Sequence, residues 1–468
     1  MDRKKDSVTV KARVSPEDHV PLRMKIGYGI GDFGANLVFL TTLFYILYYF
    51  TDILGIPPET AGIVVLAAKF WDAISDPMMG TISDRTKSRW GKKRPYLLFG
   101  AVPLGVTVFL LFYTPDFSGV PVGGLDNRVL WALLTYILFC TAITIVNVPY
   151  AALTAAMTRD SHERSIITGF RMTFGIIGTL VAAGATLPLV GLFGTGDQII
   201  GFRMVGIIYG ALIMLTSLVT FIAVRERVNP IGETNVKIPL KAIIASVIRN
   251  RPFVLLVSAT LMFMIGMNTM AAVVTYYFKY NLNAENLVAV ANLCIFIPAL
   301  LSLPLFVFIG KKMSKKLAYN LGMGIVGGML VLIFFLGERN IYLTFAFLIV
   351  AGIGLCTNWL SPWAIVPDTV EYSEWKEGIR QEGMLYGIFY FVFKFGAAVA
   401  GFLAGQILSL TGYVANQPQT ETALLGIRLL LTLLPFAFIL AGIVILSFFP
   451  IDAAMHRHMI DQIRAKKK

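Results

Sequence analysis

The chain has little charge and few of the residue patterns that build soluble catalytic sites. Only 14% of its 468 residues are charged, whereas 56% are hydrophobic and the mean hydropathy is +0.73. One soluble core could not bury that much apolar surface, so the composition predicts a membrane protein with many spans. No activated nucleophile, metal-ligand set or phosphate loop is visible, which argues against an enzyme and against a bound cofactor.

Cysteine and histidine are also scarce. The three cysteines, Cys140, Cys294 and Cys356, fall in predicted helices without metal-ligand spacing, and we expect core residues rather than disulfide partners. All four histidines lie in predicted tails or loops (His19, His162, His456 and His458). A histidine proton relay within the membrane is therefore excluded. The polar amino terminus lacks the short apolar segment of a cleavable signal peptide.

Long apolar runs dominate what is present. Each is long enough to span a bilayer, and together they predict an all-α protein with twelve transmembrane helices. They cover 26–53, 59–83, 95–114, 128–157, 165–193, 199–224, 252–279, 284–309, 317–337, 340–367, 383–412 and 422–449. Gly175, Gly178 and Gly184 on the fifth run indicate close helix contacts in lipid.

The basic residues predict the orientation. If successive helices cross the membrane in opposite directions, the Lys- and Arg-rich segments all fall on one side of it. Loops 114–127 and 413–421 fall on the other side and contain neither Lys nor Arg. The positive-inside rule then places both termini in the cytoplasm, and we expect a bacterial inner membrane. The net charge of +13 mainly reflects these basic cytoplasmic segments, and nucleic-acid binding is the weaker explanation of it.

The chain divides near its middle. We predict a cytoplasmic tail (1–25), a six-helix half (26–224), a cytoplasmic linker (225–251), a second six-helix half (252–449) and a cytoplasmic tail (450–468). The linker from Lys237 has the pattern of an amphipathic interfacial helix. The basic loops beginning at Gly80 and Gly310 lie about half the chain apart, as expected for two repeated halves that rock around a central site.

Asp72 and Asp76 lie one helical turn apart inside the second apolar run. Acids in that setting are seldom accidental. Mutual repulsion and poor solvation raise their affinity for a cation, either H⁺ or Na⁺. Ser75 and Thr144 would add hard oxygens for Na⁺ if the second and fourth helices pack together. The alternative is a static ion-pair cluster in which Lys69, Arg171 and Lys394 neutralise the acids.

Other polar and aromatic residues in apolar runs predict a substrate cavity shared by both halves. Amides would bond sugar hydroxyls and tryptophans would stack on a sugar face, although a membrane tryptophan also packs or anchors. The candidates are Asn36, Asn147, Arg171, Asn358, Trp359, Trp363 and Lys394. Arg171 and Lys394 serve either charge balance or substrate contact.

We also predict a cytoplasmic gate. The loop after the second helix would pair with acids after the tenth helix when the transporter faces outward, and these pairs would break as the halves rock. The residues are Asp84, Arg85, Arg89, Lys92 and Arg94 on one side, and Asp368, Glu371 and Glu374 on the other. Topology alone is the simpler explanation of the basic run.

Several motifs carry a family resemblance over essentially the whole chain. The segments GYGIGDFG, KFWDAISDPMMGTISDRTKSRWGKKRPYLL, NVPYAAL and PDTVEYSEWKEGIRQEG resemble the glycoside-pentoside-hexuronide:cation symporters of the major facilitator superfamily. The resemblance implies that the chain couples a sugar to Na⁺ or H⁺ by alternating access, with linked binding of the two.

Compared with the family's melibiose carriers, the resemblance implies a cation site at Asp72, Ser75, Asp76 and Thr144, with a hydroxyl at Ser75 in place of an amide. It also implies substrate contacts at Arg171, Trp359 and Lys394. Asn36, Asn147 and Ala151 stand where those carriers have two acids and a tryptophan. Melibiose itself is therefore not the expected substrate, and both a neutral glycoside and an acidic sugar stay open.

Two alternatives to sugar symport stay open as well. The resemblance extends to sodium-dependent lysophospholipid transporters. The uncharged Asn36 and Asn147 would suit the more apolar cavity of such a transporter. A non-transporting membrane sensor is the other, although no soluble signalling domain is attached.

Overall fold

The computed structural model describes residues 19–117, 126–158, 160–227, 249–377 and 382–466. Regular secondary structure in these ranges is entirely helical, as predicted. The amino-terminal group contains α1 (Leu22–Tyr48), η1 (Tyr49–Ile53), α2 (Pro58–Arg85), α3 (Arg94–Leu111), α4 (Asn127–Met157), α5 (Ser161–Gly194) and α6 (Gln198–Ala223).

The carboxy-terminal group follows residues 228–248, where the predicted amphipathic helix lies outside the described residues. It contains α8 (Arg251–Tyr276), η2 (Tyr277–Asn281), η3 (Glu285–Leu287), α9 (Val288–Lys312), α10 (Lys315–Leu336), η4 (Gly337–Arg339), α11 (Ile341–Glu377), α12 (Glu382–Leu410), α13 (Glu421–Leu431) and α14 (Leu433–Ser447). A last helix, α15 (Ala453–Lys466), extends beyond it.

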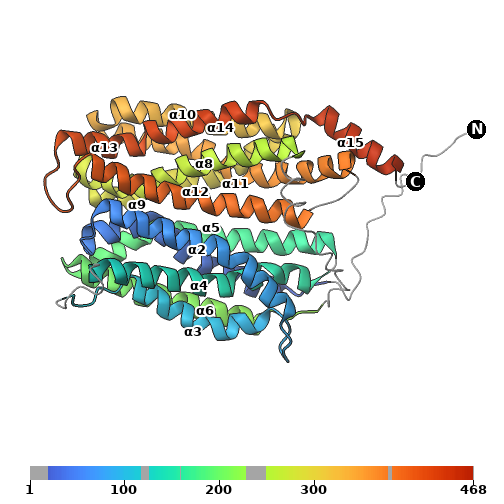
Figure 1. Cartoon of the computed structure of the whole chain (residues 1–468), viewed down its shortest axis with the longest axis horizontal. Helices are drawn as coiled ribbons and strands as arrows, with labels where there is room; N and C mark the ends of the chain where they lie inside the picture. The colour runs from blue at the N-terminus through green and yellow to red at the C-terminus, as the bar shows by residue number, and fades with distance from the viewer. Residues whose placement is uncertain (1–18, 118–125, 159, 228–248, 378–381, 467–468) are drawn as a thin grey trace, which may run out of the picture.

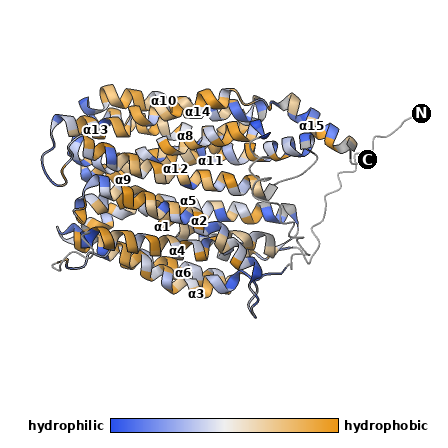
Figure 2. Ribbon diagram, in the orientation of Figure 1, coloured by the Kyte–Doolittle hydropathy of each residue, from blue (hydrophilic) through white to orange (hydrophobic). Residues whose placement is uncertain are grey.

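Eleven helical segments of the described ranges are long and apolar enough to cross a membrane. Figure 2 shows hydrophobic residues along the bundle and hydrophilic residues gathered toward its ends. The other predicted span is α2, a helix of 28 residues that is not among these eleven. Its sequence carries Lys69, Asp72 and Asp76 near its middle, and such charges lower the hydropathy of any window that contains them.

Three boundaries differ from those predicted. Helix α11 continues to Glu377, beyond the expected end at 367, because Pro362 and Pro367 lie inside the helix without ending it. The last predicted span is divided at Thr432 into α13 and α14. The predicted carboxy-terminal tail contains the helix α15.

Two ends of the bundle can be distinguished. At the basic end, on the right in Figure 1, α2 leads through the 84–94 loop into α3, and α15 extends outward. At the opposite, distal end lie η1, η2 and the start of α2. Each group of helices packs mainly on itself, and α2–α12, α5–α9 and α1–α8 are the main contacts between the groups.

Glycine permits close contacts between helices, both across the two groups and within one of them. A Cβ on Gly405 of α12 would lie 2.4 Å from the carbonyl oxygen of Pro58 and 2.8 Å from Cα of Gly62, both on α2. A Cβ on Gly178 of α5 would lie 2.4 Å from the carbonyl oxygen of Phe33. The predicted close helix contacts are confirmed, and the two groups are held tightly together near the distal end.

Candidate cation and substrate site

The acid pair on α2 faces α4 and α12. Helical spacing puts Asp72 and Asp76 on one face, and α2 is held to α4 by a hydrogen bond of 2.9 Å from Nε1 of Trp71 to Oγ1 of Thr141. Asp72 is almost fully buried, whereas the side chain of Asp76 keeps 24% of its exposure. Of the two acids, Asp76 is therefore the more accessible.

Lys394 of α12 pairs with both carboxylates. Its Nζ lies 3.0 Å from Oδ2 of Asp72 and 2.5 Å from Oδ2 of Asp76. The lysine comes from the carboxy-terminal group and the acids from the amino-terminal group, so this ion pair joins the two. One ammonium between two carboxylates leaves the cluster with one negative charge.

Hydroxyl groups complete the cluster. Oγ1 of Thr144 on α4 lies 3.0 Å from Oδ1 of Asp72 and 2.9 Å from Oδ1 of Asp76. Oγ of Ser75 lies 3.3 Å from the Thr144 hydroxyl and 3.1 Å from the Asp72 carbonyl oxygen. The structure thus brings together all four residues of the predicted cation site, and oxygen ligands of this kind suit a small hard cation.

A second charged cluster joins α1 and α5. Nε of Arg171 lies 2.9 Å from Oδ1 of Asp32, and Nδ2 of Asn36 donates to the other carboxylate oxygen at 3.0 Å. The Arg171 guanidinium also lies 5.7 Å from the ring centroid of Tyr150 on α4. A Cβ on Gly175 would lie 2.4 Å from the Asp32 carboxylate, so glycine lets α5 come this close.

The aromatic candidates differ in accessibility. Trp359 stacks on Phe296 with ring centroids 5.7 Å apart, yet is 37% exposed. Trp363 packs among aromatic rings of α12, including Phe389 at 4.8 Å. A free ring face is therefore better supported for Trp359 than for Trp363.

The two remaining amide candidates, Asn147 and Asn358, also differ in their surroundings. Asn358 is buried and accepts a hydrogen bond from the Tyr319 hydroxyl at 3.1 Å, within its own group. Asn147 lines a small pocket with Gly31 and Tyr150, beside the Asp32 cluster. Asn147 therefore shares a pocket with Tyr150, the ring beside Arg171, whereas Asn358 is bonded within its own group.

In the alternative of a static ion-pair cluster, Lys69 would neutralise the acids together with Arg171 and Lys394. Its Nζ instead lies over two aromatic rings, 4.9 Å from the centroid of Phe39 and 5.5 Å from that of Tyr136. Lys394 and Arg171 are the cations that pair with buried acids here. Lys69 stays a cation held by aromatic faces.

The predicted gate residues pair within their own groups at the basic end. Asp84 pairs with Lys93, and the Glu226 carboxylate accepts hydrogen bonds from the backbone N–H groups of Lys92, Lys93 and Arg94. The Arg89 guanidinium lies 4.1 Å from the Trp90 ring centroid. The basic loop is therefore folded onto its own group, next to Arg85 at the end of α2.

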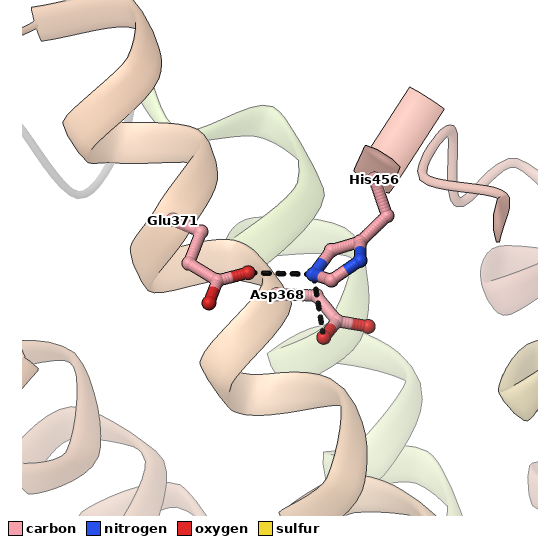
Figure 3. A group of neighbouring side chains, drawn as sticks. All are labelled: Asp368, Glu371 and His456. Carbon is pink, nitrogen blue, oxygen red and sulfur yellow. Dashed lines mark hydrogen bonds and ion pairs between the residues drawn. The ribbon is translucent and has the colours of Figure 1, made fainter. Parts of the chain in front are cut away.

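The acids of α11 are likewise held locally. Figure 3 shows Asp368 and Glu371 facing His456 of α15, whose Nε2 lies 2.6 Å from Glu371 and 3.6 Å from Asp368. Nζ of Lys315 contacts both oxygens of Asp368, at 2.7 and 2.9 Å. Because Lys315 already occupies that carboxylate, we assign no metal to this trio. The predicted pairing with the opposite loop is not formed by Asp368 or Glu371 in this conformer, and Glu374 lies one turn further along α11.

Sequence reasoning did not assign three of these partners. Asp32 was visible as a polar residue one turn before Asn36, but its pairing with Arg171, 139 positions away, has no local signal. Glu226 and His456 lay in segments interpreted as linker and tail. Only the folded arrangement shows what these side chains contact.

Comparisons with known proteins identify the family of the chain. A family model described as MFS/sugar transport protein matches residues 27–453. The uncharacterised symporter YnaJ of Bacillus subtilis (strain 168) is 37% identical over 95% of each chain. The isoprimeverose transporter of Lactiplantibacillus pentosus is 31% identical over 97% of this chain and 94% of its own.

The chain belongs to the glycoside-pentoside-hexuronide:cation symporter family. The protein is thus a sugar symporter and not an enzyme, and the lysophospholipid and sensor alternatives lose their support. The fold of the symporter is similar to that of a solved nucleoside transporter, NupG, with a TM-score of 0.66 at 14% identity, covering 90% of this chain and 99% of that one.

Proposed function

We propose that the symporter crosses the membrane twelve times as two six-helix halves, with the basic end in the cytoplasm. The length of α2 and its position between α4 and α12 support a twelfth span. Its three central charges are buried or paired, which removes the main objection to placing it in lipid. The Lys- and Arg-rich 84–94 loop supports a cytoplasmic basic end, in a bacterial inner membrane.

The coupling cation, Na⁺ or H⁺, binds at Asp72 and Asp76 in this proposal, with Ser75 and Thr144 as further oxygen donors. The observation that carries it is the position of Lys394, whose ammonium group already lies between the two carboxylates. A pair of acids that holds one positive charge in a buried site can exchange it for another. Lys394 and the coupling cation then compete for the same oxygen atoms.

This competition gives cation release a physical basis. The amino-terminal and carboxy-terminal groups of helices are packed together toward the distal end, through α2–α12 and α5–α9. At the basic end, the gate acids Asp368 and Glu371 pair with residues of their own group. We interpret this as the inward-facing conformer. Because Lys394 belongs to the other half, its distance from the acids changes as the halves rock, and its approach displaces the cation on the cytoplasmic side.

The substrate lies beside the cation site, in contact with Asn147, Trp359 and the Asp32–Arg171–Asn36 cluster. Arg171 is already neutralised by Asp32 and Lys394 by the acid pair. An acidic sugar would have to displace a buried carboxylate from its arginine, so a neutral glycoside or pentoside is favoured. Competition of labelled-sugar uptake by glucuronides tests this preference, and strong inhibition would reverse it.

Linkage couples the two ligands. If the cation favours the conformer that binds sugar, sugar raises cation affinity by the same factor. An inward-negative potential adds about 2.3 kcal/mol per 100 mV for each net charge carried, so one cation per neutral sugar supports useful accumulation.

The decisive experiment is counterflow of labelled glycosides into proteoliposomes, with and without Na⁺ and across a range of pH. Wild type is compared with Asp76→Asn. The matched control is Glu59→Gln, which changes an acid at the start of the same helix, outside the site and the predicted gate. We expect exchange to depend on Na⁺ or on protonation and to lose that dependence only in Asp76→Asn. Unchanged cation dependence in Asp76→Asn would exclude the proposed site.

A further inference from the structure

The end of α1 and the end of α8 repeat one another. Tyr-Tyr-Phe at 48–50 is followed by Leu54, and Tyr-Tyr-Phe at 276–278 is followed by Leu282 at the same spacing. Each helix ends in a π-helical turn, η1 or η2. Short π turns within helices are often found at functional sites.

The backbone geometry is repeated as well. A residue with positive φ follows each turn, Gly55 at 69° and Asn283 at 51°. The next N–H groups donate to equivalent carbonyls, Ile56 to Phe50 at 2.9 Å and Ala284 to Phe278 at 2.7 Å. The two groups of helices therefore carry the same turn at the distal end.

These paired turns contact each other. The rings of Tyr48 and Tyr276 meet edge to face with centroids 5.7 Å apart, and the hydroxyls of Thr51 and Tyr276 lie 2.7 Å apart. Nζ of Lys279 lies 2.9 Å from the Tyr48 hydroxyl. The contact thus joins the amino-terminal and carboxy-terminal groups directly.

The two turns differ in sequence at the positions that carry charged side chains. Thr51 and Asp52 of the first turn correspond to Lys279 and Tyr280 of the second. Nζ of Lys279 lies 2.9 Å from Oδ1 of Asp52, whose side chain is fully buried. The Tyr280 hydroxyl donates to the same oxygen, and the Tyr413 hydroxyl donates to the other at 2.6 Å.

We propose that the paired turns form a latch that closes the distal entrance, with Asp52–Lys279 as its separable ion pair. A buried carboxylate is stable only while it is neutralised and hydrogen-bonded. Lys279, Tyr280 and Tyr413 all belong to the other group, so separating the groups at this end removes these partners at once. Water must then replace them, which makes opening an all-or-none step.

This inference rests on the proposed alternating access but not on the identity of the sugar or of the cation. It is tested by labelling alone. Ala272 is a buried residue that lines a small pocket between the two groups of helices, together with Lys69 and Gly401. A cysteine at Ala272 serves as reporter in a chain whose three native cysteines are replaced by alanine. Intact cells are treated with a membrane-impermeant maleimide, which reaches the reporter only through the distal entrance.

We expect Asp52→Asn and Lys279→Gln each to raise the labelling rate about tenfold, because each substitution leaves the other charged side chain of the pair buried without its partner. The double variant should fall back toward the wild-type rate, which a merely unfolded protein would not do. Tyr277→Phe is the matched control within the second turn. Its hydroxyl lies outside the Asp52 cluster, so labelling should not change.

Wild-type labelling in both single variants would overturn the latch, even if transport were lost. If Asp52→Asn does not fold, Tyr413→Phe removes one donor to Asp52 and should raise labelling to a smaller extent; no rise would equally overturn the proposal. Raised labelling in these variants, together with unchanged cation dependence of transport in Asp76→Asn, would support the latch while contradicting the cation site.

Discussion

At the scale of single residues, the site is defined by which cation each buried acid holds. Asp72 and Asp76 share Lys394, and Asp32 holds Arg171. Removing one member of a buried ion pair costs far more than the pair contributes, because the other charge is left unpaired. Single and double substitutions can therefore separate charge balance from ligand binding.

Replacing Lys394 with Gln should tighten binding of the coupling cation about tenfold, because the competing ammonium is removed and the acid pair keeps both negative charges. The measurement is the cation concentration that half-saturates sugar binding to purified protein. Lys394→Arg, which keeps the charge, is the control. Weaker cation binding in Lys394→Gln would contradict competition.

Replacing Arg171 with Gln should destabilise the protein by about 3 kcal/mol, since Asp32 is left buried without its partner. The double variant Asp32→Asn/Arg171→Gln should recover most of that loss. Thermal unfolding in detergent measures both. A double variant as unstable as the single one would show that Arg171 acts through contacts other than Asp32.

At the scale of helices, hydropathy predicted the spans well because a helix in lipid must be apolar over a fixed length. It placed the end of α11 too early, since the apolar run stops before Asp368 while the helix continues to Glu377. The clustering of Asp72 and Asp76 could be predicted because they are neighbours on one helix. The Asp52 cluster could not, because Lys279 and Tyr413 lie 227 and 361 positions away.

Replacing Gly405 with Ala should slow transport, because the new methyl group would lie 2.4 Å from the Pro58 carbonyl oxygen and would hold α12 away from α2. Gly387→Ala is the control on the same helix, where no atom lies within 4 Å of the added Cβ. Initial uptake rates measure the difference. Equal rates for the two variants would show that the close contact is not needed for distal closure.

At the scale of the whole molecule, the two ends should be coupled. The distal end is closed by the paired turns, while each gate cluster at the basic end keeps local partners. If the halves rock as rigid bodies, a change that weakens one closed end shifts the population toward closure of the other.

Cysteines at Arg89 and Glu371 should therefore cross-link slowly in the wild-type background and faster when Asp52→Asn is added. The measurement is the rate of disulfide formation between the two positions, with Gly387→Ala as the background control. If Asp52→Asn leaves the rate of disulfide formation unchanged, the basic end does not close when the distal end opens. The predicted gate pairs would then lose their role.

The position of Lys394 on α12 also bears on how the chain enters the membrane. Asp72 and Asp76 are synthesised 322 and 318 residues before the lysine that neutralises them (394 − 72 and 394 − 76), and each ionised carboxylate at mid-membrane costs about 2.5–3.5 kcal/mol on insertion scales. Helix α2 therefore enters the membrane before Lys394 exists, and Thr144 of α4 reaches the acids earlier, 72 and 68 residues after them. If the coupling cation is H⁺, the affinity for a proton that serves coupling in the finished protein also eases the insertion of α2.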